Sequence, residues 1–186
     1  FSEVRKEIIR VAHGGVSIGT IRRYYFKDLM AKVRLHNCRW SIEEALQSND
    51  LIRSLYARTI ENKKVFLPEL SKCEKLEKIF QVGGSGIARN TSNFPLKTAR
   101  ATVKWFNGNR NYNDFSCGWG VRMLESVTSG VKYHGTDPNH LLVERLNMLK
   151  SDIEKVMGKP VNADIRCQGR EIFIPEFENT MGLAFS

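Results

Sequence analysis

The chain has no long apolar run and few cysteines, and these two absences exclude several classes of protein. No stretch approaches the roughly 20 apolar residues that a membrane-spanning helix needs, so we expect no membrane partner. The four cysteines lie far apart, without the paired spacing of metal ligands: Cys38, Cys73, Cys117 and Cys167. The start also lacks the pattern of a signal peptide. We therefore expect reduced thiols, no metal site and a cytoplasmic location.

Acidic residues are fewer than basic ones, which gives the 186 residues a net charge of +9. Residues 1–80 carry 16 basic and 10 acidic side chains, whereas residues 81–186 carry 13 and 10. This excess favours a polyanionic partner such as DNA, with the front part as the more basic surface. Arg22, Arg23 and Lys27 lie beside two tyrosines and are candidates for contacts with phosphates. The same pattern also fits the solvated side of an amphipathic helix.

Apolar periodicity divides the chain into a helical front, a linker and a rear part in which strands and helices alternate. We expect residues 1–82 to be helical, 83–93 to be a glycine-rich polar linker, and 94–186 to form the alternating part. Strands that alternate with helices predict an α/β fold with a parallel sheet and covered faces.

The individual elements follow from the same patterns. Ser41 and Glu44 have the spacing of a capping box, which predicts a helix start. The other expected helices are 3–12, one that opens at Ser17 or Thr20, 50–60, 68–80, 96–106, 119–129 and 140–157. The expected strands are a short one ending at 114–116, then 131–136, 162–167 and 182–186.

The run DFSCGWGVR at 114–122 places two glycines directly after a predicted strand. Gly118 and Gly120 would let the backbone pass close beneath a cofactor. Asp137 ends the next predicted strand, 23 residues after Asp114, where a carboxylate can accept both hydroxyls of a ribose. Asp114 would face a positive ammonium group, directly or through water. The pattern therefore favours S-adenosylmethionine, which has an amino-acid end, a ribose and an adenine.

Other interpretations of this turn stay open. A nicotinamide cofactor also uses a glycine turn and an acid that binds the ribose. The third glycine of its Gly-x-Gly-x-x-Gly pattern is replaced here by Met123, and Asp114 would repel a pyrophosphate. The two glycines could also merely end a strand. Trp119 fits either a cofactor wall or the core, and Arg122 fits either the cofactor carboxylate or a local ion pair.

Five short motifs are spread over residues 81–186 and carry a resemblance to a known family. They are SNFP at 92–95, DFSCGWG at 114–120, YHGTDPN at 133–139, CQG at 167–169 and GLAFS at 182–186. This part of the chain resembles phage-type DNA amino-methyltransferases, which methylate the exocyclic amine of adenine or cytosine. The resemblance implies a Rossmann-like methyltransferase sheet, incomplete at its C-terminal end, in a bacterial or phage-infected cell.

The resemblance also implies a role for each motif. Asn93 and Phe94 would approach the methionine end of the cofactor, and the turn after the third strand would lie beside its adenine. The full implied cofactor-binding set is Asn93, Phe94, Asp114, Ser116, Gly118, Gly120, Asp137, Cys167 and Gln168.

The family's catalytic signature is a Ser, Asp or Asn followed by Pro-Pro and an aromatic residue. The polar residue and a backbone carbonyl hold the target amine, and the aromatic ring stacks on the flipped base. Ser186 occupies the first of these positions and is the last residue of the sequence. We therefore expect a fragment that is inactive alone and that needs a further segment or a second chain for catalysis and target recognition.

Three functions stay open at this point. The leading one is methyl transfer from S-adenosylmethionine to an exocyclic amine in DNA. The alternative is a non-catalytic DNA-binding or regulatory module that keeps the fold, which the basic charge and the absent loop favour. A methyltransferase that acts on RNA or on a small molecule is the third, since the target region is not in this sequence.

Overall fold

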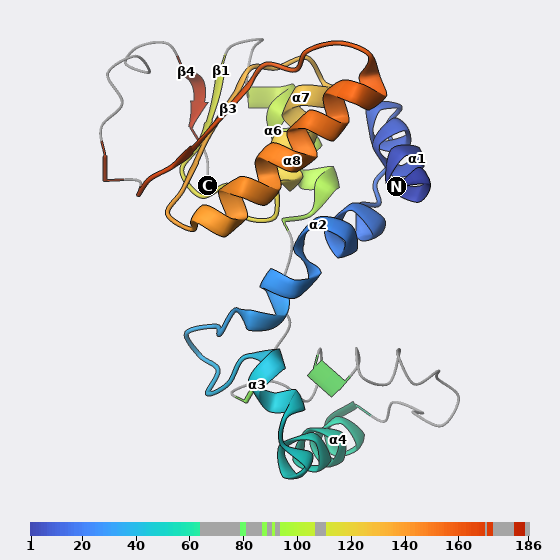
Figure 1. The fold of residues 1–186 in the computed structure, drawn as a ribbon, viewed down its shortest axis with the longest axis vertical. Helices are drawn as coiled ribbons and strands as arrows, with labels where there is room; N and C mark the ends of the chain where they lie inside the picture. The colour runs from blue at the N-terminus through green and yellow to red at the C-terminus, as the bar shows by residue number, and fades with distance from the viewer. Residues whose placement is uncertain are drawn as a thin grey trace. The chain divides into compact units, whose positions relative to one another are not determined.

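The structure of the protein, a computed structural model, describes residues 1–63, 79–80, 87–88, 91, 94–106, 111–169, 171–172 and 181–184. Helices come first, and strands and helices then alternate (Figure 1). The helices are α1 (Ser2–Ala12), α2 (Gly19–Lys32), α3 (Ile42–Leu46), α4 (Asn49–Lys63), α6 (Leu96–Phe106), α7 (Val121–Thr128) and α8 (His140–Met157). The strands are β1 (Asn111–Asp114), β2 (Tyr133–Asp137), β3 (Ala163–Cys167) and β4 (Met181–Ala184). The predicted α/β class is confirmed.

Most predicted elements within these ranges are present. The predicted helices 96–106 and 140–157 coincide with α6 and α8. The capping box before α3 is confirmed: Glu44 N–H donates to the Ser41 hydroxyl at 3.1 Å, and Ser41 N–H donates to the Glu44 carboxylate at 2.7 Å. Most of the predicted helix 68–80 and of the linker 83–93 lies outside the described residues. None of the helices in the described ranges is long and apolar enough to cross a membrane.

The prediction was wrong about where the helix after the glycine turn begins. It starts at Val121 rather than at Trp119. Gly120, just before it, has a φ of 74°, in the left-handed region that a right-handed helix cannot include. Trp119 therefore belongs to the turn.

The four strands form one sheet in the order β3-β2-β1-β4, and every neighbouring pair is parallel. The predicted parallel sheet is therefore confirmed. Tyr112 and Tyr133 are register partners on β1 and β2, are almost fully buried and have ring centroids 5.7 Å apart. Parallel strands end at the same edge of a sheet. The last residues of β1, β2 and β3 (Asp114, Asp137 and Cys167) consequently share one edge.

Helix α8 packs against β2 and β3 and begins directly beside this edge. Its buried stripe has the spacing expected for one helical face: Leu142, Leu146, Leu149 and Ile153. The side chain of Asn139 caps its start by accepting from the backbone N–H groups of Leu141 and Leu142. The cap thus lies two residues after Asp137.

The chain forms two compact units, and their limits differ from the expected ranges. One unit contains residues 1–27 and 93–186, and the other contains residues 28–92. The first 27 residues therefore group with the sheet, because α1 packs against α7 and α8. The Glu7 carboxylate is buried and accepts from Ile21 N–H at 2.7 Å, which joins α1 to α2. The other unit has its own apolar cluster, which includes Ile42 and Leu55.

Two glycines with similar positive φ values allow a matched test of this packing. Gly120 has a φ of 74°, and an added Cβ would lie 2.7 Å from Leu146 Cδ2 on α8. Gly130 has a φ of 77°, and an added Cβ would meet nothing within 4 Å. In both alanine variants the free energy of unfolding should fall by about 1–2 kcal/mol, because a Cβ is strained in the left-handed backbone region. Gly120→Ala should lower it by about 1–3 kcal/mol more, because its methyl group overpacks the core. Equal decreases in the two variants, measured by urea unfolding, would contradict this packing.

Candidate functional site

The glycine turn between β1 and α7 lies at the carboxyl edge of the sheet. Gly118 and Gly120 have φ values of 52° and 74°, which favour glycine. Cys117 N–H donates to the Thr136 carbonyl at 3.2 Å and so fixes the turn to the end of β2. The turn therefore passes next to the acid that ends β2.

Asp137 is only 8% exposed and lies beside the turn. Asn139 N–H donates to Oδ1 at 3.0 Å. Burial raises the pKa of Asp137, and the nearby backbone groups of Asn139 and Gly118 oppose that effect. The glycine turn and Asp137, which were predicted separately, therefore lie next to each other.

Asp114 is 0% exposed and fully engaged with groups of the protein. Arg122 Nε donates to Oδ2 at 2.8 Å and Nη2 donates to Oδ1 at 2.9 Å. The Tyr133 hydroxyl donates to Oδ2 at 2.7 Å, and Ser116 N–H donates to Oδ1 at 3.2 Å. Burial raises the pKa of Asp114, and the hydrogen bonds and charge of Arg122 oppose it. The expected direct contact with an ammonium group is not available in this arrangement, because these donors occupy both carboxylate oxygens.

Arg122 is the residue that joins the separate segments of the site. Besides Asp114, it donates to the Ser116 carbonyl in the turn. Its guanidinium carbon lies 5.1 Å from the centroid of the Phe94 ring, in a cation–π arrangement. The local ion pair is therefore the observed one of its two expected roles. Phe94 is brought next to the turn, whereas Asn93 lies outside the described residues.

Trp119 and Cys117 are packed residues of the turn. The Trp119 ring lies 5.8 Å from the ring of Phe26 on α2, centroid to centroid. Cys117 is 1% exposed, and burial raises the pKa of its thiol to about 12. A thiol with such a pKa stays protonated at neutral pH and is a poor nucleophile.

Cys167 and Gln168 extend the site along the same edge. Cys167 pairs with Asp137 in the β2–β3 register, and Gln168 N–H donates to the Asp137 carbonyl at 3.1 Å. Cys167 is exposed. The Gln168 Nε2 atom is buried, and it has no hydrogen-bond partner within the described residues. No pattern in the sequence signalled this buried donor without a partner.

The remaining predicted residues lie elsewhere. Ser186 is outside the described residues, and Ser116 contributes its backbone to the contacts above. On α2, Arg23 and Lys27 are exposed, whereas Arg22 is half-buried. At about 100° per helical residue, Arg22 lies about 140° from Lys27 around the axis, on the opposite side of Arg23, so Arg22 does not share the exposed face of the other two.

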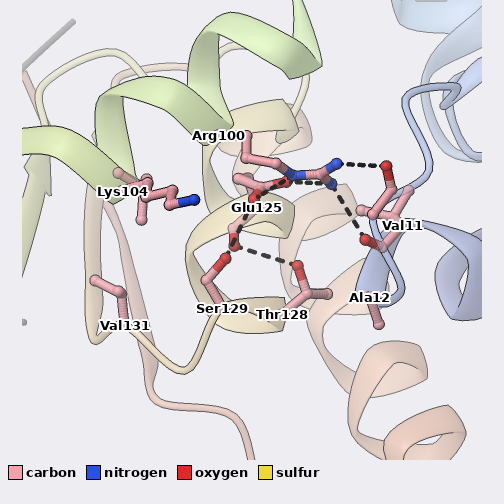
Figure 2. A pocket seen from close by; sticks show the side chains of 10 residues that line it. Val11, Ala12, Arg100, Lys104, Glu125, Thr128, Ser129 and Val131 are labelled. Carbon is pink, nitrogen blue, oxygen red and sulfur yellow. Dashed lines mark hydrogen bonds and ion pairs between the residues drawn. The ribbon is translucent and has the colours of Figure 1, made fainter.

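A hollow with a volume of about 540 Å³ lies at the other end of α7, away from the glycine turn (Figure 2). Arg100 of α6 crosses it and donates to both carboxylate oxygens of Glu125, each at 2.9 Å. The same guanidinium donates to the carbonyls of Val11, Gly14 and Gly15 at the end of α1. These contacts satisfy helix-end carbonyls and fasten α1, so we assign the hollow a structural role.

Comparisons with protein-family models, with curated proteins and with solved structures found no match to this chain. In the described ranges, no three or more His, Cys, Asp or Glu side chains are grouped so that they could hold a metal ion.

Removing Arg122 should leave a buried, unpaired carboxylate. We expect Arg122→Met to lose about 3–5 kcal/mol of unfolding free energy. The double variant Asp114→Asn/Arg122→Met should recover part of that loss, because no buried charge is left. Urea denaturation at pH 7 measures both. Arg10→Met, at an exposed arginine of α1, is the control, and an equal loss there would contradict the special role of Arg122.

Proposed function

We propose that this chain provides the S-adenosylmethionine site of a methyltransferase that acts on the exocyclic amine of adenine or cytosine in DNA. One observation carries the proposal: the buried Asp137 carboxylate, which accepts from Asn139 N–H, lies beside the backbone of Gly118 at the shared end of β1 and β2. A carboxylate that can accept hydroxyl groups is thereby held beside a turn that has no side chain at Gly118 and Gly120. That combination suits a ligand that contains a ribose.

The strand order supports a Rossmann-like methyltransferase sheet. The order β3-β2-β1-β4 matches the first four strands of the doubly wound nucleotide-binding fold. In such a sheet the order reverses beside β1, and ligands bind in the crevice outside the carboxyl ends of the strands at that point. The glycine turn and Asp137 lie at this edge.

The residues at this edge fit S-adenosylmethionine. Asp137 would accept the ribose hydroxyls, Gly118 would allow close approach, and the turn at Gln168, directly after β3, would lie beside the adenine. When bound, the cofactor supplies an electrophilic methyl group on a sulfonium ion. The protein would hold this ligand through Asp137 while Arg122 keeps the turn in place.

A nicotinamide dinucleotide is the main alternative ligand. The repulsion expected between Asp114 and a pyrophosphate is weakened, because Arg122 neutralises that carboxylate. The preference for S-adenosylmethionine over a dinucleotide therefore depends on Met123, which stands at the third glycine position of the dinucleotide motif. Its side chain is fully buried, so the close backbone approach that glycine provides there is replaced by core packing.

Isothermal titration calorimetry with S-adenosylmethionine tests the proposal. The unmodified chain should bind it in preference to NAD⁺. Asp137→Asn, which keeps an oxygen for Asn139 N–H, should weaken binding by about 1–3 kcal/mol, or roughly 5- to 150-fold. Glu144→Gln, at an exposed carboxylate of α8, should bind normally. Unchanged affinity in the Asp137 variant, or tighter binding of NAD⁺, would reject the assignment.

The pH dependence of binding gives an independent check. The ionised form of Asp137 accepts both ribose hydroxyls, whereas its protonated form must use one oxygen as a donor. Because burial raises the pKa of Asp137, affinity should start to fall at a higher pH than it would for an exposed aspartate. Calorimetry between pH 8 and pH 5 should show this decrease in the unmodified chain. Asp137→Asn should lack it, and a parallel decrease in both proteins would assign the effect to another group.

A further inference from the structure

The first 27 residues have a strong excess of positive charge within the unit that contains the sheet. They include six lysine and arginine side chains and only two acids. Glu7 is buried and accepts from Ile21 N–H, and Glu3 pairs with Lys6 at 2.6 Å. The five other cations make no ion pair within the described residues: Arg5, Arg10, Arg22, Arg23 and Lys27. Their charge is therefore available to an anionic partner.

Helix α2 presents two of these cations together with an aromatic ring. Arg23 and Lys27 are four residues apart, and Tyr24 and Lys27 are three apart, so the three side chains share one helical face. All three are exposed, and Tyr24 keeps 53% of its surface accessible. This combination suits a nucleic acid, whose phosphates attract cations and whose sugars and bases pack on aromatic rings.

The buried face of the same helix contacts the candidate cofactor site. Phe26 is fully buried, and its ring lies 5.8 Å from that of Trp119 in the glycine turn. The Tyr25 hydroxyl donates to Asp152 Oδ2 on α8 at 2.6 Å. The exposed face is therefore held in a fixed position relative to the turn, and a polyanion bound to it would lie near the cofactor.

We propose that the exposed face of α2, formed by Arg23, Tyr24 and Lys27, binds the phosphate backbone of nucleic acid beside the cofactor turn. The inference rests on the proposed function only for the choice of DNA as the nucleic acid. An anionic membrane is the other source of phosphates. Membrane-binding helices combine cations with a face of Trp, Phe or Leu, whereas this face carries only Tyr24. Arg5 and Arg10 of α1 are also exposed and add to the positive field that steers a polyanion.

The test is the salt dependence of binding to a short fluorescent DNA duplex, measured by anisotropy. Each phosphate contact contributes about 0.9 to the slope of log K against log salt. Arg23→Gln/Lys27→Gln should lower that slope by about 2 and weaken binding. Lys150→Gln/Lys159→Gln is the matched control, since it removes the same charge from and beside α8. It should leave the slope unchanged.

Two outcomes would overturn the inference. One is an equal change in the two double variants, which would mean that only net charge matters. The other is tighter binding to phosphatidylserine–phosphatidylcholine vesicles than to DNA, with the same dependence on Arg23 and Lys27. Circular dichroism confirms that each variant is folded. Calorimetry with S-adenosylmethionine separates this inference from the proposed function. If DNA binds through α2 but the cofactor does not bind, the proposed methyltransferase function is rejected and the inference about α2 is retained.

Discussion

The buried ion pair between Asp114 and Arg122 is the interaction on which the geometry of the carboxyl edge depends. A carboxylate without exposure to water is costly unless it is paired and hydrogen-bonded. Here the guanidinium contacts both carboxylate oxygens, the Ser116 carbonyl and the face of Phe94. One side chain thus connects the end of β1, the turn and the segment before α6.

This pairing determines which acid is left for a ligand. Because Arg122 neutralises Asp114, Asp137 is the carboxylate at this edge that has no cation partner within the described residues. It accepts from the backbone N–H of Asn139, which holds it in place without cancelling its charge. A ligand that offers hydroxyl groups is therefore better suited to this position than one that brings a second anion.

Helix α2 connects the candidate site to the basic surface of the same unit. Its inner face packs on the turn through Phe26, and its outer face carries Arg23 and Lys27. Nucleic acid and cofactor would then bind to opposite sides of one rigid element. Such an arrangement can position a nucleic acid near the cofactor although the two bind to separate surfaces.

Local patterns in the sequence determined the helices α6 and α8, the capping box of α3, the parallel sheet and the edge shared by Asp114 and Asp137. These features depend on residue spacing and on backbone preferences, which neighbouring residues decide. Tertiary structure alone decided that residues 1–27 pack with the sheet, that Asp114 is buried against Arg122 and Tyr133, and that the buried Gln168 donor has no partner among the described residues. The partner of a charged side chain depends on which groups packing brings within about 3 Å, and linear spacing does not specify that distance.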